Sequence, residues 1–318
     1  MALLKLVPDN TNLRFMWLRK ISFPLSILLA IASVTLFFTV GLNYGIDFKG
    51  GTLIEIKTDG PADVASIRSE LGNLNLGDVQ VQQFGGDDEV LIRIEEQPGG
   101  ELAQQSVVAK IKTAFEDQNV EFRRTEVVGP RVSGELARAG AMAVGAALLA
   151  ILVYIWFRFE WQFAIGAILT TANDVLVTVG LFVILQLDFS LSSIAAVLTI
   201  IGYSLNDTVV VYDRIRENLR RYKKIPLADL LDRSINETLS RTTLTSFTTL
   251  LALIALWAFG GEVIRSFTLA MIFGIVIGTY SSIFLAAPFL ILFNLRRDGK
   301  TPGGEDAQEL DVDAESAA

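Results

Sequence analysis

Residues 191–214 read LSSIAAVLTIIGYSLNDTVVVYDR, and this stretch decides the fold. Its apolar part, about 191–211, is long enough to cross a bilayer, because a helix rises about 1.5 Å per residue and the hydrocarbon core is about 30 Å thick. Asn206 and Asp207 nevertheless stand side by side within it. A bare carboxylate in hydrocarbon costs roughly 2.5–3.5 kcal/mol on insertion scales. The stretch therefore predicts a membrane helix in which either a partner group offsets that cost or the acid is kept for its charge.

The composition of the whole chain agrees with a membrane protein. Of 318 residues, 51% are hydrophobic and 19% are charged, and the mean hydropathy is +0.46. Soluble domains have about a quarter of their residues charged. The chain has no Cys and no His, which excludes disulfides, thiol chemistry, histidine metal sites and histidine acid–base catalysis. Any proton chemistry must use Asp, Glu, Tyr, Lys, Arg or water.

Six apolar stretches are long enough, or nearly so, to span a membrane as helices. They are 21–41, 137–157, 161–187, 191–211, 242–259 and 267–293. The first could be mistaken for a secretory signal, since Ala30-Ile31-Ala32 resembles a cleavage site. Because the apolar residues continue through Val40, we interpret it as a retained transmembrane helix.

The basic residues predict the orientation of these spans, because cytoplasmic loops of membrane proteins are enriched in Lys and Arg. One set of flanks and loops holds Lys5, Arg14, Arg19, Lys20, Arg158, the basic residues from Arg214 to Arg233, Arg296, Arg297 and Lys300. The short loops on the other side hold only Arg265. We therefore predict that the N-terminal segment 1–20, the loop 212–240 and the tail 294–318 are cytoplasmic. The segment 42–135 is then extracytoplasmic.

The C-terminal segment 294–318 is strongly acidic. Its acids are Asp298, Glu305, Asp306, Glu309, Asp311, Asp313 and Glu315. Together with its Gly, Pro and Ala content, this favours a disordered, solubilising tail. A binding role is the alternative.

The long segment 42–135 has the pattern of a small soluble domain. Strands are expected at 52–57, 79–84, 89–95 and 120–128, with helices after Pro61 and over 101–118. The order β-α-β-β-α-β is that of a ferredoxin-like α+β domain. The fold class is therefore a mainly α membrane protein with six transmembrane helices and one extracytoplasmic α+β domain between the first two.

No enzyme site is predicted in this domain. It has no metal-ligand spacing and no nucleophile–base set. Gly50-Gly51-Thr52 leads into a strand and lacks the spacing of a phosphate-binding loop. We expect no enzymatic activity, no cofactor, no bound metal and no nucleic-acid partner. A small domain on a membrane stem is more plausibly one that contacts a partner or moves.

Polar residues inside the predicted spans form the candidate site. They are Asp207 and Asn206 in the fourth span, Asp174 in the third and Arg241 at the start of the fifth, with Tyr203 and Thr245 as possible supporting groups. Charges of mixed sign in neighbouring membrane helices are typical of an ion path or proton relay. Two other interpretations stay open: an Asp–Arg pair that only orients the helices, and an Asp207 that lies at the level of the cytoplasmic headgroups.

Two further patterns predict helix packing. Ala270, Gly274, Gly278, Ser282 and Ala286 recur every four residues along the sixth span, a pattern typical of closely packed helix pairs. After Pro226, apolar residues share one helix face, which predicts an amphipathic helix at the cytoplasmic interface.

Several blocks of the sequence resemble a known family. They are GIDFKGGT at 45–52, VGPRV at 128–132, FRFEW at 157–161 and the run from IGYSLNDT at 201–208 to RIREN at 214–218. These blocks are similar to those of the SecD/SecF family, and within it to the SecF branch. The family consists of membrane subunits of the bacterial Sec protein-export system and is related in fold to the resistance–nodulation–division exporters.

The resemblance implies an auxiliary subunit of the protein translocase in the bacterial inner membrane, which uses the proton-motive force to assist preprotein export. It implies SecD, the SecYEG channel and the preprotein as partners, with YajC and YidC as further candidates, all in a lipid membrane. The residues at Asp207 and Arg241 are regarded as central to proton transport in the family, and Asp174 lies in a related motif. Some relatives have His where this chain has Asn173, so the resemblance implies no relay through a histidine here.

The residues alone leave three functions open. One is the proton-driven export subunit, working with a homologous six-span partner. Another is a small-molecule/proton antiporter that works as a homo-oligomer. The third is a scaffold subunit whose buried charges only fix assembly. Whether Na⁺ replaces H⁺ also stays open, because carboxyl and hydroxyl groups can bind either.

Overall fold

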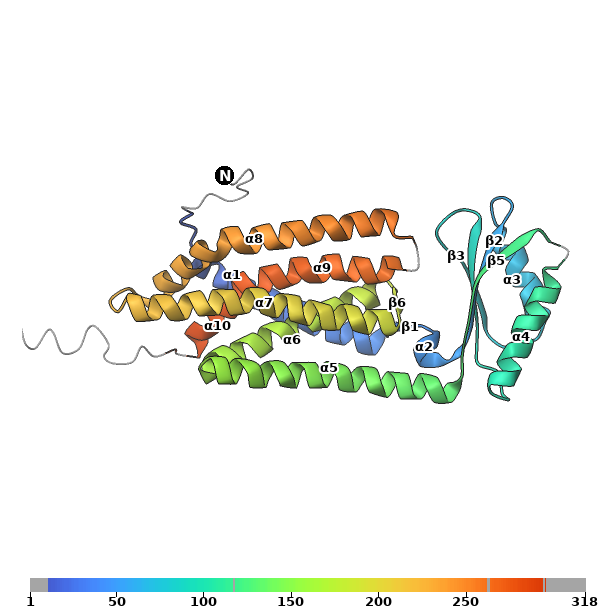
Figure 1. Ribbon diagram of the computed structural model, residues 1–318, viewed down its shortest axis with the longest axis horizontal. Coiled ribbons are helices and arrows are strands. Elements are labelled where there is room, and N and C mark those ends of the chain that lie inside the picture. The colour runs from blue at the N-terminus through green and yellow to red at the C-terminus, as the bar shows by residue number, and fades with distance from the viewer. Residues whose placement is uncertain (1–10, 117, 262–263, 294, 296–318) are drawn as a thin grey trace, which may run out of the picture.

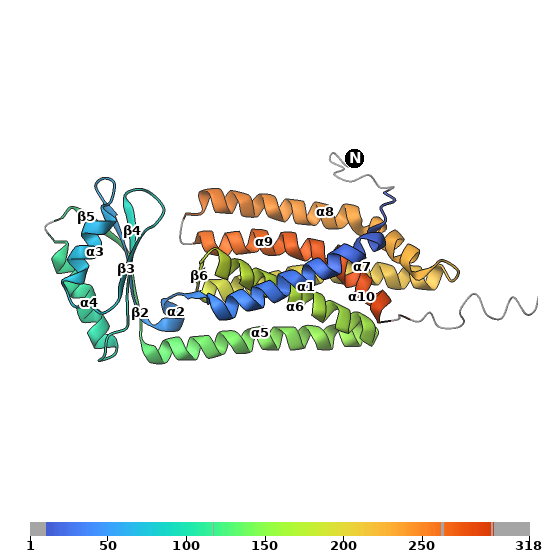
Figure 2. The same ribbon diagram turned by 180° about the vertical axis from the view of Figure 1, so that it is seen from behind.

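The computed structural model describes residues 11–116, 118–261, 264–293 and Leu295. The described chain forms a bundle of long helices with a small α+β domain at one end (Figures 1 and 2). Within the described residues, six helices are long and apolar enough to cross a membrane. The predicted fold class is therefore confirmed. The predicted acidic tail, apart from Leu295, lies outside the described residues.

The α+β domain contains two helices packed on one face of a four-stranded antiparallel sheet. Its elements follow the predicted order: β2 (Gly51–Thr58), α3 (Val64–Gly72), β3 (Val79–Gln83), β4 (Glu89–Ile94), α4 (Glu101–Ala114) and β5 (Val120–Val128). In the sheet the strands lie in the order β3-β4-β2-β5. This arrangement is the ferredoxin-like fold that the sequence pattern predicts.

Alternation along the strands builds the core of this domain. Ile54 and Ile56 of β2 and Ile92 of β4 are completely buried on the face that the helices cover, since successive side chains of a strand point to opposite faces. At the start of α3, the Asp63 carboxylate accepts the amides of Ala65 and Ser66, both at 3.0 Å. Such a cap fixes where the helix begins.

The bundle consists of α1 (Phe15–Thr39), α5 (Pro130–Arg158), α6 (Trp161–Ile184), α7 (Leu191–Arg221), α8 (Leu227–Phe259) and α9 (Arg265–Ser281). The last helix continues through a π-helical segment, η2 (Ser282–Ala286), into α10 (Ala287–Leu292). In Figure 1, α5 runs along one side of the bundle and connects directly to the domain. Much of its surface is exposed, with Met142, Leu149 and Phe157 turned outward.

Several boundaries differ from the sequence interpretation. The first helix begins at Phe15 rather than at 21, and α7 and α8 leave only residues 222–226 non-helical where a loop was expected over 212–240. An apolar run in the sequence ends where the helix leaves the membrane. The helix itself can continue as long as one of its faces is buried. The charged faces of the two extensions pair with each other, as Arg214 does with Glu237 at 2.7 Å.

The amphipathic segment after Pro226 is therefore not a separate interfacial helix, as the sequence had suggested. It is the first part of α8, and its side chains Leu230, Leu231 and Ile235 are fully buried. They pack in one cluster with Phe15 and Met16 of α1. Its apolar face meets protein rather than lipid.

The stripe of small residues in the last span packs against α7, which confirms the predicted helix contact. A side chain at Gly274 would meet Ile200, and a Cβ at Gly278 would lie 3.1 Å from the Cβ of Ser204. Close backbone approach of this kind brings polar side chains of two membrane helices within hydrogen-bonding reach.

Three small elements described at the junction of domain and bundle were not predicted. The short helix α2 (Ile46–Lys49) and the strand β1 (Asn43–Tyr44) follow α1, and β1 pairs in parallel with β6 (Asp188–Phe189) between α6 and α7. The block GIDFKGGT thus forms the joint between the first span and the sheet.

Candidate functional site

Asp174 is the most deeply buried carboxyl group of the described bundle. It lies on α6 with no exposed surface. Ser204 Oγ of α7 donates a hydrogen bond to Asp174 Oδ2 at 2.6 Å, and Ser281 Oγ of α9 donates to the same oxygen at 2.7 Å. The other oxygen, Oδ1, has no partner among the described residues. Three helices thus converge on one carboxyl group, and hydroxyl groups rather than cations hold it.

More hydroxyl groups extend this network along α7 and the last span. Thr208 Oγ1 and Ser282 Oγ lie 3.0 Å apart. Ser282 Oγ can donate to the carbonyl oxygen of Gly278 at 2.8 Å or of Ser204 at 3.3 Å. The π-helical segment begins at Ser282, and a π-bulge shifts the register of a helix locally. The consecutive residues Ser281 and Ser282 are both buried. The Ser281 hydroxyl bonds to Asp174 of α6, and the Ser282 hydroxyl bonds to Thr208 of α7.

Asp207 lies on α7 beside this network. Its side chain is 3% exposed, and its Oδ2 has no hydrogen-bond partner among the described residues. It follows Ser204 by three residues and precedes Thr208, so the group that holds Asp174 is one helical turn away along the same helix. Asp207 therefore lies inside the bundle rather than on its surface.

Arg241 and Asn206 occupy the outer surface of the bundle. Both side chains are exposed, and no ion pair joins Arg241 to either aspartate in the part of the chain described. Among the described residues, the candidate site is therefore not a closed cluster of Asp207, Asp174 and Arg241. It consists of two buried carboxyls and a cation that faces outward.

The two supporting residues have other partners. Tyr203 Oη donates to Thr249 Oγ1 at 3.5 Å and links α7 to α8. Thr245 Oγ1 donates to carbonyl oxygens of its own helix, at 2.9 Å to Thr242 and 3.1 Å to Arg241. Neither hydroxyl contacts a carboxyl group in the described structure.

The residues that sequence analysis missed are the hydroxyl donors Ser204, Ser281 and Ser282 together with Thr208. Ser204 stands within the opening stretch, three positions before Asp207, and Ser282 belongs to the small-residue stripe. The available signal was a hydroxyl group in the small-residue stripe, because that stripe packs on the helix that carries Asp207. It could have indicated a hydrogen-bond donor near the acids.

The end of α7 next to the α+β domain is fastened to that domain. The amide of Leu191, the first residue of α7, donates to Asp47 Oδ2 of α2 at 2.8 Å. A carboxylate at this place is favourable because the first amides of a helix lack intrahelical partners. Arg93 of β4 forms an ion pair with Asp188 of β6, immediately before α7.

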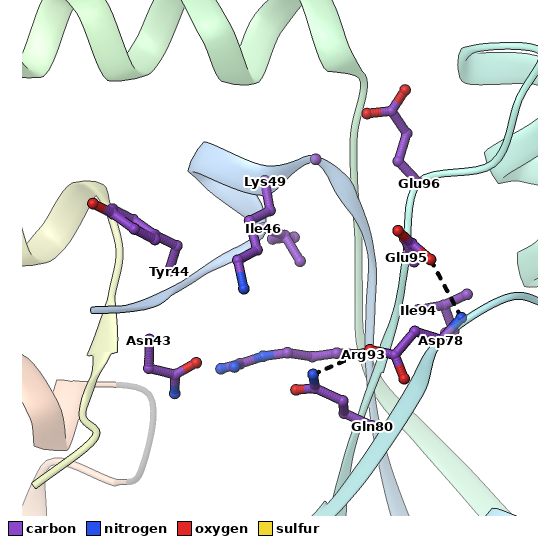
Figure 3. A pocket seen from close by; sticks show the side chains of 11 residues that line it. Asn43, Tyr44, Ile46, Lys49, Asp78, Gln80, Arg93, Ile94, Glu95 and Glu96 are labelled. Atoms are coloured by element: carbon purple, nitrogen blue, oxygen red, sulfur yellow. Dashed lines mark hydrogen bonds between the residues drawn. The ribbon is translucent and has the colours of Figure 1, made fainter. Parts of the chain in front are cut away.

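A cavity of about 480 Å³ lies at this junction. Figure 3 shows Arg93 extending from the sheet across the cavity toward Asn43 of β1. The lining carries both signs of charge, including Lys49, Glu95 and Glu96. The described residues contain no group of three or more Asp and Glu side chains placed to hold a metal ion.

Comparison with known proteins identifies the family. Residues 107–296 match the C-terminal region of the protein export membrane proteins SecD/SecF, and residues 35–62 match the SecD/SecF GG motif. The chain is 44% identical to the protein translocase subunit SecF of Cereibacter sphaeroides, over 98% of this chain and 99% of that protein.

Longer relatives contain this chain as a part. The chain is 48% identical to the protein translocase subunit SecDF of Brucella abortus, over 99% of its own length but 41% of that protein. The crystal structure of SecDF from Thermus thermophilus, a translocon-associated membrane protein, superposes with a TM-score of 0.82 at 36% identity. That match covers 92% of this chain and 40% of the other. With the family match, the near full-length identity and the shared fold all in agreement, this chain belongs to the SecD/SecF family of protein-export membrane proteins.

Proposed function

We propose that this protein is an auxiliary subunit of the Sec protein translocase that couples proton movement through its bundle to the α+β domain, and so assists preprotein export. The observation that carries the proposal is the pair of buried carboxyls, Asp174 and Asp207, neither of which has a cationic partner within hydrogen-bonding distance among the described residues. Its relatives are named as subunits of the protein translocase.

Proton binding explains why the bundle keeps these acids. A buried carboxylate without a counter-ion is costly in a membrane, whereas a protonated carboxyl is much cheaper. Each carboxyl therefore exists in two states that favour different surroundings. A change in protonation of Asp207 would favour different positions of α7, and α7 is the helix whose first residue is fastened to the domain through Asp47. One charge that crosses 100 mV releases about 2.3 kcal/mol, enough to bias a two-state protein.

A second, homologous subunit would complete the site. Arg241 and Asn206 face outward on α8 and α7, and an exposed arginine in a membrane helix is expected to face a partner or a water-filled path. The chain corresponds to 41% of the length of the Brucella SecDF relative. We propose that SecD covers this surface and that SecYEG and the preprotein are the further partners, with YajC and YidC as remaining candidates.

The proposed orientation follows the basic residues. Arg158 and the basic residues of α7 and α8 near 214–233 lie at the end of the bundle remote from the domain (Figure 1). The positive-inside rule places that end in the cytoplasm of a multi-pass inner-membrane protein and the domain outside. The coupling ion is proposed to be H⁺, with Na⁺ as the competing possibility.

Gradient-driven release of a preprotein from membrane vesicles tests the proposal. Asp207→Asn removes the charge at nearly constant shape, and we expect it to abolish the part of release that depends on the proton gradient. Asp229→Asn, an exposed acid at the start of α8, is the matched control and should leave release unchanged. If the Asp207→Asn complex is intact and releases preprotein normally under a gradient, the proton-coupling proposal is wrong. If a Na⁺ gradient alone drives release by the unaltered complex, the coupling ion is Na⁺ rather than H⁺.

A further inference from the structure

A basic pocket lies at the end of the bundle remote from the α+β domain. It has a volume of about 490 Å³ and lies between the end of α5 and the last turns of α7. It is lined by Arg158, Asp213, Arg216, Glu217, Arg220 and Arg221. We propose that this pocket binds the phosphate group of an anionic phospholipid. The inference goes beyond the proposed export function and is independent of proton coupling.

Two of its arginines are held in place by one buried ring. Phe159, which is 6% exposed, lies under the guanidinium groups of Arg158 at 5.0 Å and of Arg216 at 6.0 Å. Arg216 Nη1 also donates to the carbonyl oxygen of Arg158 at 3.2 Å. Two cations are thus fixed next to each other, an arrangement that an anion between them would stabilise.

The acids of the pocket do not neutralise it. Asp213 pairs with Arg158 at 3.0 Å. Glu217 pairs with Arg214, which points away from the pocket toward α8, at 2.5 Å. Arg216, Arg220 and Arg221 have no acidic partner within the described ranges. Apart from Arg216 Nη1, which donates to the Arg158 carbonyl oxygen, the donors of these arginines can bind an external anion, and the planar guanidinium group matches phosphate oxygens in pairs.

Exposed aromatic residues fix the depth of the pocket in the membrane. Trp156 and Phe157 end α5 and are 65% and 88% exposed, and Trp161, at the start of α6, is 52% exposed. Such side chains gather at the level of the lipid headgroups. Arg158 lies between them in sequence, so its guanidinium is at the level of lipid phosphates. This position favours a lipid, whose acyl chains would lie along the exposed aromatic side chains of α5, over a dissolved anion.

One other source of negative charge must be distinguished. The C-terminal segment of this chain is acidic, and its carboxylates could in principle occupy the same arginines. The exposed aromatic residues beside the pocket favour the lipid, because a polar acidic segment gains nothing from them. Removal of the tail distinguishes the two occupants. Phosphatidylglycerol binding should be unchanged if the lipid fills the pocket, and it should become stronger if the tail fills it.

Binding of phosphatidylglycerol to the purified full chain tests the proposal, measured by native mass spectrometry with phosphatidylcholine as the neutral reference lipid. The double variant Arg216→Gln/Arg220→Gln should weaken phosphatidylglycerol binding by roughly 25-fold, since each of the two basic residues near a membrane surface contributes a factor of about five. Arg233→Gln is the matched control, because Arg233 is held by Glu237 at 2.9 Å outside the pocket. A second variant, Arg216→Lys/Arg220→Lys, keeps the charge and should lose only part of the affinity.

Three results would overturn the proposal. The first is that the folded double variant, judged by an unchanged melting temperature, binds phosphatidylglycerol as tightly as the unaltered chain. The second is that inorganic phosphate at equal concentration displaces the lipid from the pocket, which would make it a site for free anions. The third is that the double variant differs from the unaltered chain only after residues 301–318 are removed, which would identify the tail as the occupant.

Discussion

The α+β domain and the helical bundle surround their carboxyl groups in opposite ways. In the domain, Asp88 pairs with Lys57 at 3.1 Å and Glu89 pairs with Arg123 at 2.8 Å, with all four side chains partly open to solvent. In the bundle, Asp174 accepts hydrogen bonds from the hydroxyls of Ser204 and Ser281, and no ion pair to it is found among the described residues. Opposite charges thus meet where water already screens them, and they are kept apart where water is excluded.

This difference separates charges that assist folding from charges that need another explanation. Exposed ion pairs contribute little and can be replaced at small cost. Carboxyl groups inside a membrane bundle are expensive, and well-packed apolar residues often do as well or better for stability. The paired acids Asp88 and Glu89 are therefore explained by the surface of the domain, whereas we explain Asp174 and Asp207 by a change of state.

The largest effect is expected where the helix packing that encloses Asp174 is disturbed. Gly278→Val would push its side chain into Ser204, whose Cα lies 3.4 Å from a Cβ at this position. Overpacking of this kind costs about 1–3 kcal/mol, and it would also draw Ser281 away from Asp174. We expect a clear fall in the melting temperature of the purified protein and loss of export activity.

Gly145→Val is the matched control for this substitution. Gly145 lies in the membrane helix α5, and a Cβ there meets nothing within 4 Å in the described structure. It shares the cost of a β-branched residue in a helix but not the clash. If the melting temperatures of both variants fall equally, close contact of α7 and α9 does not hold the hydroxyl groups in place. The contrast between bundle and domain would then lose its structural basis.

Most of the fold could be predicted from the sequence because each part has its own periodicity. Ile54-Glu55-Ile56-Lys57 alternates apolar and charged residues, and the transmembrane segments are long apolar runs. The ends of α7 and α8 could not be predicted, because burial of Leu230 and Leu231 against α1 depends on a contact more than two hundred residues away in sequence. Hydropathy predicts which segments lie in the membrane, but it does not predict such long-range contacts.

The candidate site could be predicted only as a set of acids. Asp174 and Asp207 stand out because charges are rare in apolar runs. Ser204 and Ser281 do not stand out, since serine is common in packed membrane helices and its hydroxyl can bond to its own helix. Which serine faces an acid depends on the rotation of the helices, and the π-helical register at Ser282 gives no signal in the sequence.

A smaller effect is expected at the Arg93–Asp188 ion pair, which connects the two regions. Arg93 and Asp188 are 11% and 31% exposed, between the surface pairs of the domain and the buried acids of the bundle. Arg93→Gln should loosen the junction locally by about 1 kcal/mol, close to the upper limit for exposed pairs. Hydrogen–deuterium exchange of peptides covering 43–50 and 186–193 should become roughly fivefold faster.

Arg123→Gln breaks a pair within the domain only and is the control. It should leave exchange at the junction unchanged. If Arg93→Gln also leaves exchange at the junction unchanged, the domain is held by β1, β6 and Asp47 without help from Arg93. The Arg93–Asp188 pair is then as weak as the surface pairs of the domain. If exchange spreads through the whole of α7, the pair is instead part of the bundle's own stability.

The smallest effect concerns the Lys57–Asp88 pair, which defines the domain side of the comparison. The hydrogen bond from Lys57 holds the pKa of Asp88 below its ordinary value. A lowered pKa in the folded state means that the pair contributes stability above the ordinary carboxyl range and loses it as the pH falls through the folded pKa. Nuclear magnetic resonance titration of the Asp88 carboxyl carbon should show the pKa rising in Lys57→Gln. In Arg123→Gln it should rise less, because Arg123 acts on Asp88 only through the weaker effect of its charge at a distance. An equal rise in both variants would mean that the general field of the domain, rather than one contact, sets the behaviour of its acids.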